Sequence, residues 1–360
     1  MAHILALRFS ALGDVAMTIP VLASFAKAYP EHEVTLLSRG WMAPLFEYLP
    51  KNVHFRGVNL NDYKGIGGLL RLFRELKGEQ HYDYVADLHD VMRTQILRLA
   101  FMATGIKVAH VDKGRKGKRG LVRASNKVLA PLKPMEQRYA DVFRKLGFPL
   151  EVRRVGLDAQ QEAITARLQG LAEGDDFMQF FLSGQGCRIG IAPFAQHEGK
   201  IYPLEMMERV IECLGEVTGA KVFLFGAGPK ERTWCEGVSA QMPYVVSMVG
   251  RYKLDVELAM MSRLDVMLTM DSANMHLASL CGVPTVSIWG ATHPFAGFTG
   301  LQQEGSDTVQ LEMPCRPCSV FGNKPCRNGS NHACMRNIRP EMVAERIIKF
   351  LSKTGKCPNA

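Results

Sequence analysis

The sequence predicts an α/β protein built from two Rossmann-like domains, and three observations support this prediction. Short apolar runs alternate with longer amphipathic segments, as parallel strands alternate with the helices that connect them. The alternation restarts after about residue 155 and so gives two runs of similar length. The chain has 360 residues, of which 47% are hydrophobic and 22% charged, and this suits two globular cores better than one.

In the first half, each expected strand is a short, mostly aliphatic run bounded by polar or turn-forming residues. These strands cover residues 3–9, 33–39, 53–58, 82–90 and 107–112. Apolar periodicity indicates helices over residues 15–29, 68–77, 91–104 and 134–148. Pro20 lacks a backbone donor, so we expect the first helix to be kinked or to begin late. Gly147 is suited to cap the last of these helices.

The second half repeats the pattern. Strands are expected over residues 187–195, 221–228, 244–250, 265–271 and 284–292. Helices are expected over residues 161–173, 203–217, 231–241, 254–264, 272–282 and 339–353. Pro203 stands near the first turn of its helix, and Asp255 stands where an acid favours the positive end of a helix.

The net charge of +9, from 44 basic and 35 acidic residues, favours an anionic partner. Residues 112–123, DKGRKGKRGLVR, hold six basic residues against Asp112. We expect this segment to be a loop, either simply solvated or in contact with an anionic acceptor such as a phosphorylated lipid-linked sugar. Nucleic acid is the least favoured partner, because no aromatic side chains that could stack on bases are interleaved with the cations.

No apolar run approaches the roughly 18 residues that a membrane-spanning helix needs. The N-terminus, MAHILALRFS, has an apolar stretch interrupted by Arg8, and no small-residue cleavage site follows it. It therefore does not resemble a signal peptide, and we expect a cytoplasmic protein.

Four of the nine cysteines form a C-x2-C-x7-C-x7-C cluster, Cys315, Cys318, Cys326 and Cys334. Four-cysteine zinc sites normally pair two short C-x2–4-C hairpins, and only the first pair here has that spacing. A structural zinc site, one or two disulfides, and packed reduced thiols all remain open. Elsewhere we predict no metal site.

Ligands of open parallel sheets bind beyond the carboxyl ends of the strands, so the residues that follow the strands are the candidates for a site. Asp14 follows the first strand at the start of a helix, where it is either a general base or a simple partner of the helix dipole. Lys200 precedes a helix and suits a diphosphate, although an ordinary surface lysine explains it as well. Gly226 lies in a glycine turn, which allows close backbone approach to a ligand or is a plain tight turn.

Two successive strands near the C-terminus also end in polar turns. Asp271 ends one strand, Ser272 can cap the helix that follows, and the N–H groups of residues 272–274 would face an anion. His276, on the same helix, is either a packed residue or part of the site. Thr292 lies in the small polar turn after the next strand. Together these two turns predict a donor pocket.

Three segments resemble glycosyltransferase family 9, the bacterial heptosyltransferases. RFSALGDVAMTIPVL (8–22) resembles the N-terminal segment of the family, and TMDSANMHLASLCGVPTVSIWGATHP (269–294) resembles its donor-site segment. The C-R-P-C motif and the later C-M-R-N-I-R-P-E-M-V (334–343) also look like many members. The segments occur in the family's order over nearly the whole chain.

This resemblance implies a GT-B type α/β fold, with two Rossmann-like domains whose parallel sheets face a central cleft. Residues 1–155 would form the acceptor-binding domain and residues 156–338 the nucleotide-sugar domain. The C-terminal helix, within 339–360, would pack back on the N-terminal domain.

The resemblance also assigns roles. Asp14 corresponds to the proposed catalytic base, Lys200 to the phosphate-contacting lysine and Asp271 to the acid that contacts the donor. The donor-binding set that we predict is Lys200, Asp271, Ser272, Ala273, His276, Gly226 and Thr292. The acceptor-binding set is Ser10, Arg93, Lys116 and Arg119. The chain departs from the family in Ala273, where members have glycine, and in Tyr202, near which members often have tryptophan after the lysine; both changes leave the donor sugar open.

The expected function is an inverting transfer of a sugar, heptose from ADP-heptose, to a lipopolysaccharide-core or related glycan. The resemblance implies no metal or other cofactor beyond this nucleotide-sugar co-substrate. A lipid-linked, anionic acceptor would bring the protein to the inner face of the cytoplasmic membrane. One alternative is a non-catalytic nucleotide-binding GT-B protein. The other is an NAD(P)-dependent oxidoreductase, although the G-x-G-x-x-G fingerprint and its later acid are missing. The oligomeric state stays open.

Overall fold

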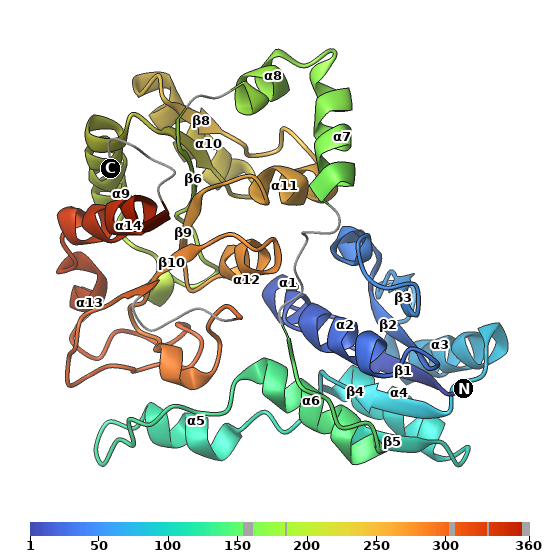
Figure 1. The fold of residues 1–360 in the computed structure, drawn as a ribbon. Coiled ribbons are helices and arrows are strands. Elements are labelled where there is room, and N and C mark those ends of the chain that lie inside the picture. The colour runs from blue at the N-terminus through green and yellow to red at the C-terminus, as the bar shows by residue number, and fades with distance from the viewer. Residues whose placement is uncertain (154–160, 184–185, 302–306, 330, 355–360) are drawn as a thin grey trace. The chain divides into compact units, whose positions relative to one another are not determined.

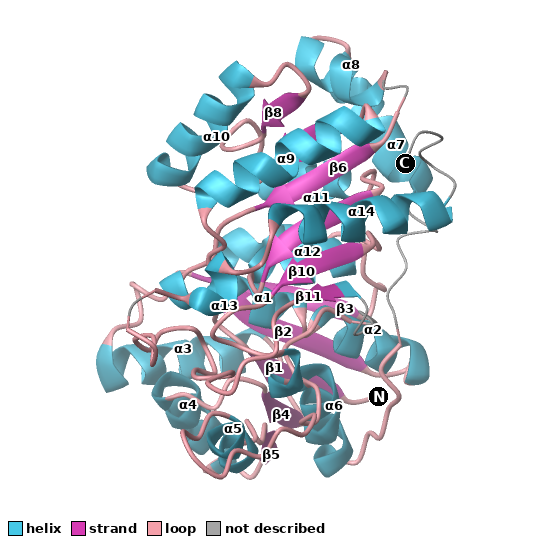
Figure 2. Cartoon of the chain, turned by 90° about the vertical axis from the view of Figure 1, so that its left-hand side faces the viewer, coloured by secondary structure: helices cyan, strands magenta, loops and turns pink. Residues whose placement is uncertain are grey.

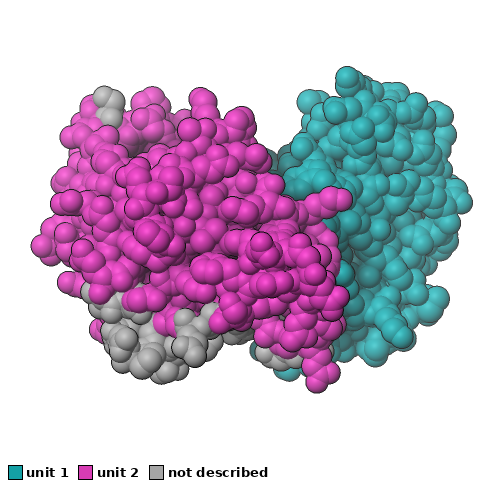
Figure 3. Space-filling view, turned by 90° about the horizontal axis from the view of Figure 1, so that it is seen from above, with its two compact units in different colours: residues 1–115, 133–155 teal, residues 116–132, 156–360 magenta. Residues whose placement is uncertain are grey.

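The computed structural model describes residues 1–153, 161–183, 186–301, 307–329 and 331–354. The chain divides into two compact units, shown in teal and magenta in Figure 3. The first unit comprises residues 1–115 and 133–155, and the second comprises residues 116–132 and 156–360. Residues 116–132 thus group with the second unit, whereas the sequence predicted a continuous N-terminal domain over 1–155.

The sheet of the first unit is parallel, with the strand order β3-β2-β1-β4-β5 (Figure 1). Its strands are β1 (His3–Leu7), β2 (Glu33–Arg39), β3 (Val53–Val58), β4 (Tyr84–Asp87) and β5 (Lys107–His110). Leu7 at the end of β1 is in register with Leu37 on one side and Asp87 on the other. The strand order reverses between β1 and β4, so the loops after these two strands flank the usual ligand position of an open α/β sheet.

Helices cover both faces of this sheet (Figures 1 and 2). One face carries α2 (Ile19–Ala28) and α6 (Met135–Leu146), and the other carries α3 (Gly65–Glu79) and α4 (Met92–Met102). The short α1 (Leu12–Ala16) lies between β1 and α2, and η1 (Gly40–Phe46) follows β2. Pro20 falls at the start of α2, which confirms the late start, and Gly147 caps α6 with φ 110°.

The first unit buries an aliphatic core between the sheet and α3 and α4. Helix α3 contributes Leu69, Leu72 and Leu76, spaced three and four residues apart so that they share one face. They pack in one cluster with Leu5 and Val85 of the central strands. Each fully buried leucine stabilises the fold by about 2 kcal/mol, so this packing fixes the strands whose ends form the site.

The sheet of the second unit is also parallel, with the order β11-β10-β9-β6-β7-β8. Its strands are β6 (Arg188–Ala192), β7 (Lys221–Leu224), β8 (Val245–Ser247), β9 (Val266–Met270), β10 (Thr285–Ile288) and β11 (Thr308–Val309). The order reverses between β6 and β9, which pair Ala192 with Thr269. The loops after β6 and β9 therefore flank the ligand position of this sheet.

Helices again cover both faces. One face carries α9 (Leu204–Thr218), α10 (Pro229–Gln241) and α14 (Pro340–Thr354). The other carries α11 (Leu254–Met261) and α12 (Ala273–Leu280), with α7 (Gln161–Ala172) packed against α11 and α8 (Asp176–Leu182) packed against α7. The short elements are η3 (Glu198–Lys200), η4 (Pro294–Ala296) and α13 (Ala333–Arg336). Within the described residues, no helix combines the length and apolar composition needed to cross a membrane.

Helix α14 lies against α9 of its own unit, whereas the sequence predicted that the C-terminal helix packs back on the N-terminal domain. Its buried residues are Val343, Ala344, Ile347 and Leu351, which form one stripe of the helix. This stripe belongs to the same core cluster as the sheet and α9. The apolar face is thus already covered within the second unit.

The basic segment is not a loop over its whole length, because Arg115–Leu121 form helix α5. The helix buries Leu121 and the side chain of Lys118, whose ammonium lies 4.0 Å from the ring centroid of Phe298. Farther along, the N–H of Leu132 donates a 2.9 Å hydrogen bond to the carbonyl of Phe295. These contacts explain why the segment groups with the second unit.

Candidate functional site

In the first unit, the loop after β1 brings Arg8 and Asp14 together. Arg8 directly follows β1, and its side chain is buried. One guanidinium nitrogen lies 2.7 Å from a carboxylate oxygen of Asp14, and another donates a 2.7 Å hydrogen bond to the carbonyl of Leu88, just after β4. The same Asp14 oxygen accepts a 3.1 Å hydrogen bond from the N–H of Ala11. Asp14 is thus held by a buried cation while its own side chain stays 28% exposed.

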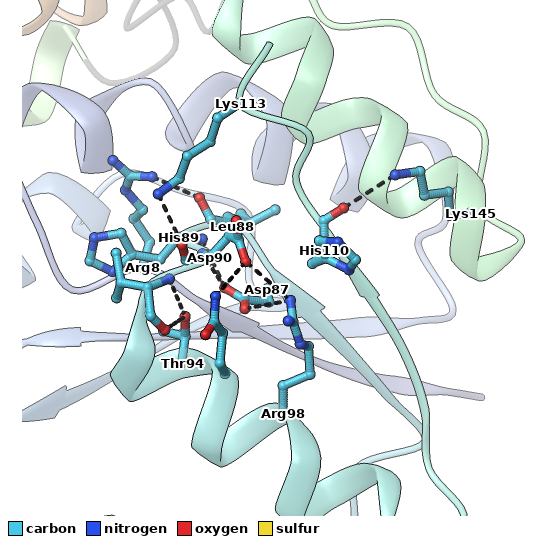
Figure 4. Close-up of polar contacts among 12 residues, drawn as sticks. Arg8, Asp87, Leu88, His89, Asp90, Thr94, Arg98, His110, Lys113 and Lys145 are labelled. Atoms are coloured by element: carbon cyan, nitrogen blue, oxygen red, sulfur yellow. Dashed lines mark hydrogen bonds and ion pairs between the residues drawn. The ribbon is translucent and has the colours of Figure 1, made fainter. Parts of the chain in front are cut away.

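The loop after β4 is fixed by the buried carboxylate of Asp87 (Figure 4). One of its oxygens accepts hydrogen bonds of 2.9 and 2.8 Å from the N–H groups of His89 and Asp90, and the other lies 3.1 Å from a guanidinium nitrogen of Arg98. These bonds hold Asp90 in a left-handed conformation, with φ 46°. The ammonium of Lys113 donates a 3.0 Å hydrogen bond to the Asp90 carbonyl and so lies beside the same loop.

His89 is an uncharged residue among cations. Burial, together with the positive charges of Arg8 and Lys113, lowers its pKa to about 3. Its Nδ1 accepts a hydrogen bond of 3.4 Å from the N–H of Phe9. Since the ring stays neutral, the local charge is set by the surrounding cations and by Asp14 and Asp90. This excess of positive groups suits an anionic acceptor.

Helix α6 adds two buried polar side chains, Tyr139 beside Arg8 and Glu136. The Arg8 guanidinium carbon lies 5.7 Å from the ring centroid of Tyr139. The Tyr139 hydroxyl and the Nε of Arg8 have no hydrogen-bond partner among the described residues. Burial raises the pKa of Tyr139, so its hydroxyl stays protonated, and burial raises the pKa of Glu136 to about 7. Two buried donors are therefore available to an oxygen of a ligand.

In the second unit, the loops after β6 and β9 bring Lys200 and Asp271 together. The Lys200 ammonium lies 2.8 Å from a carboxylate oxygen of Asp271. Lys200 ends the short helix η3, and Asp271 directly follows β9. The side chains are 15% and 6% exposed, so the carboxylate is the more buried partner. Two residues that the sequence predicted for the donor are thus in direct contact.

Unpartnered hydroxyls lie in the loops after β9 and β10. The side-chain oxygens of Ser272 and Thr292 are buried, and neither has a hydrogen-bond partner among the described residues. Ser272 is the N-cap residue of α12, whose first residue is Ala273 and whose buried residues include His276. The free N–H groups of such a helix start attract anions. Both hydroxyls are therefore available to a ligand beyond the sheet.

The loop after β7 places Glu231, which sequence reasoning missed, against the glycine turn at Gly226. The Glu231 carboxylate accepts a 2.6 Å hydrogen bond from the N–H of Ala227. A Cβ atom on Gly226 would lie 2.8 Å from that carboxylate, so a side chain there would require the Glu231 carboxylate to shift. Because β7 pairs with β6, this acid lies one strand away from the Lys200 loop. The feature of the sequence that could have identified Glu231 is the position of an acidic residue a few residues after the glycine turn.

Close backbone packing positions the stem of Lys200. A Cβ atom on Gly322 would lie 2.6 Å from the Lys200 Cγ, and Gly322 has φ 75°. A Cβ atom on Gly199 would lie 2.9 Å from both the Ala291 Cβ and the Gly322 carbonyl oxygen. Side chains at these two glycines would therefore displace the lysine or the loop after β10.

Arg316 fixes the loop after β10, and only its place in the C-R-P-C motif marked it in the sequence. Its guanidinium is buried and donates to the carbonyls of Gly290 at 2.5 Å and Thr292 at 3.0 Å. It also donates to the carbonyl of Leu311 and, at 2.9 Å, to the side chain of Gln310. This set of bonds holds Thr292 in place.

Cys315, Cys318, Cys326 and Cys334 are free thiols in this structure, in contrast to the disulfide alternative, and the first, second and fourth of them lie close enough to Arg316 to affect its charge. The described residues contain no group of three or more histidine, cysteine or acidic side chains arranged to hold a metal ion. Burial raises the pKa of Cys334 to about 11, and it also raises the pKa of Cys318. These thiols remain protonated at neutral pH, and they pack beside the donor-side loop.

The remaining predicted residues fall in different places. Ser10 shares the β1–α1 loop with Arg8, just before the helix that holds Asp14, and Arg93 is an exposed residue at the start of α4, after the Asp87 loop. Lys116 and Arg119 are exposed on α5 and belong to the second unit rather than to the expected acceptor domain. Tyr202 is a core residue whose hydroxyl donates a 2.7 Å hydrogen bond to the carbonyl of Ile338.

Residues 69–328 match the model of glycosyltransferase family 9, described as heptosyltransferase. The chain is 28% identical over 137 residues to lipooligosaccharide heptosyltransferase 2 of Campylobacter jejuni. That match spans 37% of this chain and 41% of the relative, or about two fifths of its length. It is 23% identical over 364 residues to lipopolysaccharide heptosyltransferase 2 of Salmonella typhimurium, across 96% of this chain and 97% of the relative.

The fold is similar to that of the solved structure of E. coli ADP-heptose LPS heptosyltransferase II. The TM-score is 0.68 at 18% identity, over 99% of this chain and 100% of the other. This likeness, together with the two helix-covered parallel sheets, confirms the expected GT-B type α/β fold. The match to the family model covers well over half of the sequence. The alternative prediction of an NAD(P)-dependent oxidoreductase is therefore wrong. The chain belongs to glycosyltransferase family 9.

Proposed function

We propose that this protein is an inverting glycosyltransferase that transfers heptose from ADP-heptose to an anionic, lipid-linked glycan of the lipopolysaccharide-core type. The observation that carries the proposal is the Lys200–Asp271 pair at the switch point of the second sheet, beside two buried, unpartnered hydroxyls. Membership of family 9 and the names of the relatives, which are heptosyltransferases, support the same reaction. The ADP-heptose named for the similar E. coli structure supports the donor.

The donor would bind in the second unit. Lys200 would neutralise a phosphate of the diphosphate, and the N–H groups at the start of α12 would add donors for it. Ser272 and Thr292 would supply hydroxyl hydrogen bonds, and Glu231 would accept from a ribose hydroxyl of the nucleotide. His276, a buried residue of α12, would belong to the same donor-binding set.

Asp14 would act as the general base of the first unit. The carboxylate removes the proton from an acceptor hydroxyl, whose oxygen then attacks the anomeric carbon of the sugar. The new carbon–oxygen bond forms on the face opposite the diphosphate while the bond from carbon to the phosphate oxygen breaks. The proton remains on Asp14, and the nucleotide diphosphate leaves with the bond's electron pair. Lys200 would stabilise the negative charge that develops on the leaving group.

The acceptor would meet a positively charged surface. Arg8, Lys113 and Arg39 lower the pKa of His89 through their charges, and Arg93 is exposed at the start of α4. Ser10 lies in the loop between β1 and α1, and Asp14 follows within α1. On the second unit, the exposed Lys116 and Arg119 of α5 would be further cations for an anionic acceptor. Phosphate or carboxylate groups of a core glycan fit these cations. Since such an acceptor is lipid-linked, the protein would work as a peripheral protein at the inner face of the cytoplasmic membrane.

The experiment that tests the donor site is calorimetric and thermal-shift titration of ADP and ADP-heptose against the native protein and Asp271→Ala. A ligand that binds only the folded protein raises its melting temperature. We expect ADP to stabilise the native chain and to lose this effect in Asp271→Ala, whereas NAD(P) shifts neither. The exposed Asp62→Ala serves as a matched control in the first unit. Absence of any ADP effect on the native protein would overturn the proposal.

A further inference from the structure

The segment 116–132 of the second unit combines cations with exposed aliphatic side chains. No acidic residue stands between Asp112 and Glu136, and no aromatic residue stands there either. The segment itself contributes Lys116, Lys118, Arg119, Arg123 and Lys127. Five cations within 17 residues, with no acidic residue among them, create a local positive potential.

Several side chains and backbone groups of this segment, which includes most of α5, contact later parts of the second unit (Figure 1). Lys127 donates hydrogen bonds of 2.6 and 3.1 Å to the carbonyls of Arg316 and Pro314. Arg327 donates a 2.7 Å hydrogen bond to the carbonyl of Val122. With the Lys118–Phe298 contact and the Leu132–Phe295 hydrogen bond, these bonds connect the segment at several points to the loops that follow β10 and β11. The side chains of Arg119, Arg123, Val128 and Leu129, which lie between these points, are exposed.

The outward side chains are both charged and apolar. Arg119 and Arg123 are exposed, and Val128 and Leu129 are 58% and 56% exposed. The N–H of Val128 donates a 3.2 Å hydrogen bond to the carbonyl of Gly120, so the apolar pair lies next to α5 and its cations. Neighbouring aliphatic side chains that are exposed to water do not stabilise a solvated loop. They suit a lipid bilayer, whose anionic headgroups lie outside an apolar interior.

We propose that Arg123 and the Val128–Leu129 pair dock this segment on a bilayer surface that carries anionic lipid headgroups. The cations would lie among the headgroups, and the two aliphatic side chains would enter the boundary with the acyl chains. This inference deepens the proposed function, because a lipid-linked acceptor is presented at such a surface. It is separate from donor recognition, which uses Lys200 and Asp271.

Vesicle co-sedimentation of the full-length chain tests this docking. The probes are phosphatidylcholine vesicles with and without phosphatidylglycerol. We expect binding only to the vesicles that contain phosphatidylglycerol, and weaker binding as salt screens the charges. Arg123→Gln should lower the partition constant about fivefold. Val128→Ser combined with Leu129→Ser should lower it about tenfold, because the apolar contact is lost.

The matched control is Leu99→Ser combined with Met102→Ser, an exposed apolar pair on α4 of the first unit. This variant should keep vesicle binding, and an equal loss would assign the docking to α4 and overturn the proposal. Equal binding to neutral vesicles would also overturn it, as would binding of a single-stranded RNA oligonucleotide in place of vesicles. ADP titration of the Val128→Ser, Leu129→Ser variant should match the native protein. Vesicle binding without ADP binding would therefore refute the proposed function and leave the docking intact, and the reverse result would refute only the docking.

Discussion

In each sheet, the loops next to the point where the strand order reverses hold a pair of opposite charges. The two pairs differ in which partner is buried. In the first unit the cation is buried, with Arg8 6% exposed and its partner Asp14 28% exposed. In the second unit the carboxylate is buried, with Asp271 6% exposed and Lys200 15% exposed. A buried cation leaves a carboxylate facing outward, whereas a buried carboxylate leaves an ammonium facing outward. The same pairing can therefore hold a base in one unit and an anion receptor in the other.

The two pairs are also anchored differently. The Arg8 guanidinium has a second bond, to the Leu88 carbonyl, so its position is set by the loop after the neighbouring strand. Lys200 is positioned by steric contact of its stem with Gly322 instead. A guanidinium offers several donors in fixed directions, whereas an ammonium is a compact point charge that can turn toward a ligand. The difference fits a rigid base in the first unit and an adaptable phosphate contact in the second.

The largest effect that separates the two pairs is expected for Asp14→Asn. The amide keeps the shape of the side chain but cannot remove a proton, so kcat should fall about a thousandfold. ADP affinity should be unchanged, because the donor contacts belong to the second unit. Steady-state transfer assays and ADP calorimetry check both parts. Asp62→Asn, an exposed acid of the first unit, should leave kcat unaltered; loss of ADP affinity in Asp14→Asn would break the comparison.

A second test uses Glu136, a buried acid on α6 of the first unit. Burial raises the pKa of Glu136 to about 7. Between pH 4.5 and 7 the folded chain keeps a proton that the unfolded chain releases, so the free energy of unfolding falls as pH rises through this window. Above pH 7 the loss should approach about 3 kcal/mol. Glu136→Gln should abolish this pH dependence and be the more stable chain above pH 7. Urea unfolding of both chains at pH 5 and pH 8 checks this, and parallel pH profiles would contradict it.

A smaller effect is expected at the other pair. Lys200→Gln leaves the buried Asp271 without its cation and removes a diphosphate contact, and ADP affinity should fall about thirtyfold. Lys230→Gln, on α10 of the same unit, is the matched control and should bind ADP normally. Calorimetric titration measures both. Unchanged affinity in Lys200→Gln would remove the anion-receptor role from this pair.

The smallest effect concerns Tyr202, two residues beyond Lys200. Tyr202→Phe removes the hydroxyl that donates to the Ile338 carbonyl, and the free energy of unfolding should fall by about 1 kcal/mol. ADP affinity should stay the same, because the tyrosine is a core residue. Denaturant unfolding and ADP titration test the two statements, and weakened ADP binding at unchanged stability would place Tyr202 in the donor site instead.

Local patterns predicted the alternating elements and the residues at strand ends. Asp14, Lys200 and Asp271 were predicted as site residues because they fall between a strand and the next helix and match the family segments, and both signals depend only on neighbouring sequence. The residues that contact and position these side chains, such as Arg8, were harder to predict. Arg8 contacts Leu88 across 80 positions, and this contact depends on β1 and β4 being neighbours in the sheet, which periodicity does not encode.

The same limit applies to whole segments. The apolar stripe of α14 predicted that this helix packs on something, but not that α9 is its partner. The charge of α5 masked the buried Leu121 and the inward-facing Lys118, so a helix was taken for a loop. Glu231 and Arg316 were missed for a related reason, because a single charged residue acquires meaning only from the loop that it meets.

Residues 116–132 have a consequence for how this protein is synthesised. The chain leaves the first unit after residue 115, returns to it at residue 133 and leaves again after residue 155. Val122 therefore emerges from the ribosome 205 residues before Arg327, which donates a hydrogen bond to its carbonyl. The second unit cannot be completed from a continuous C-terminal fragment that starts at residue 156. Such a fragment would leave the Phe298 ring without the Lys118 ammonium and the Pro314 and Arg316 carbonyls without the Lys127 donor.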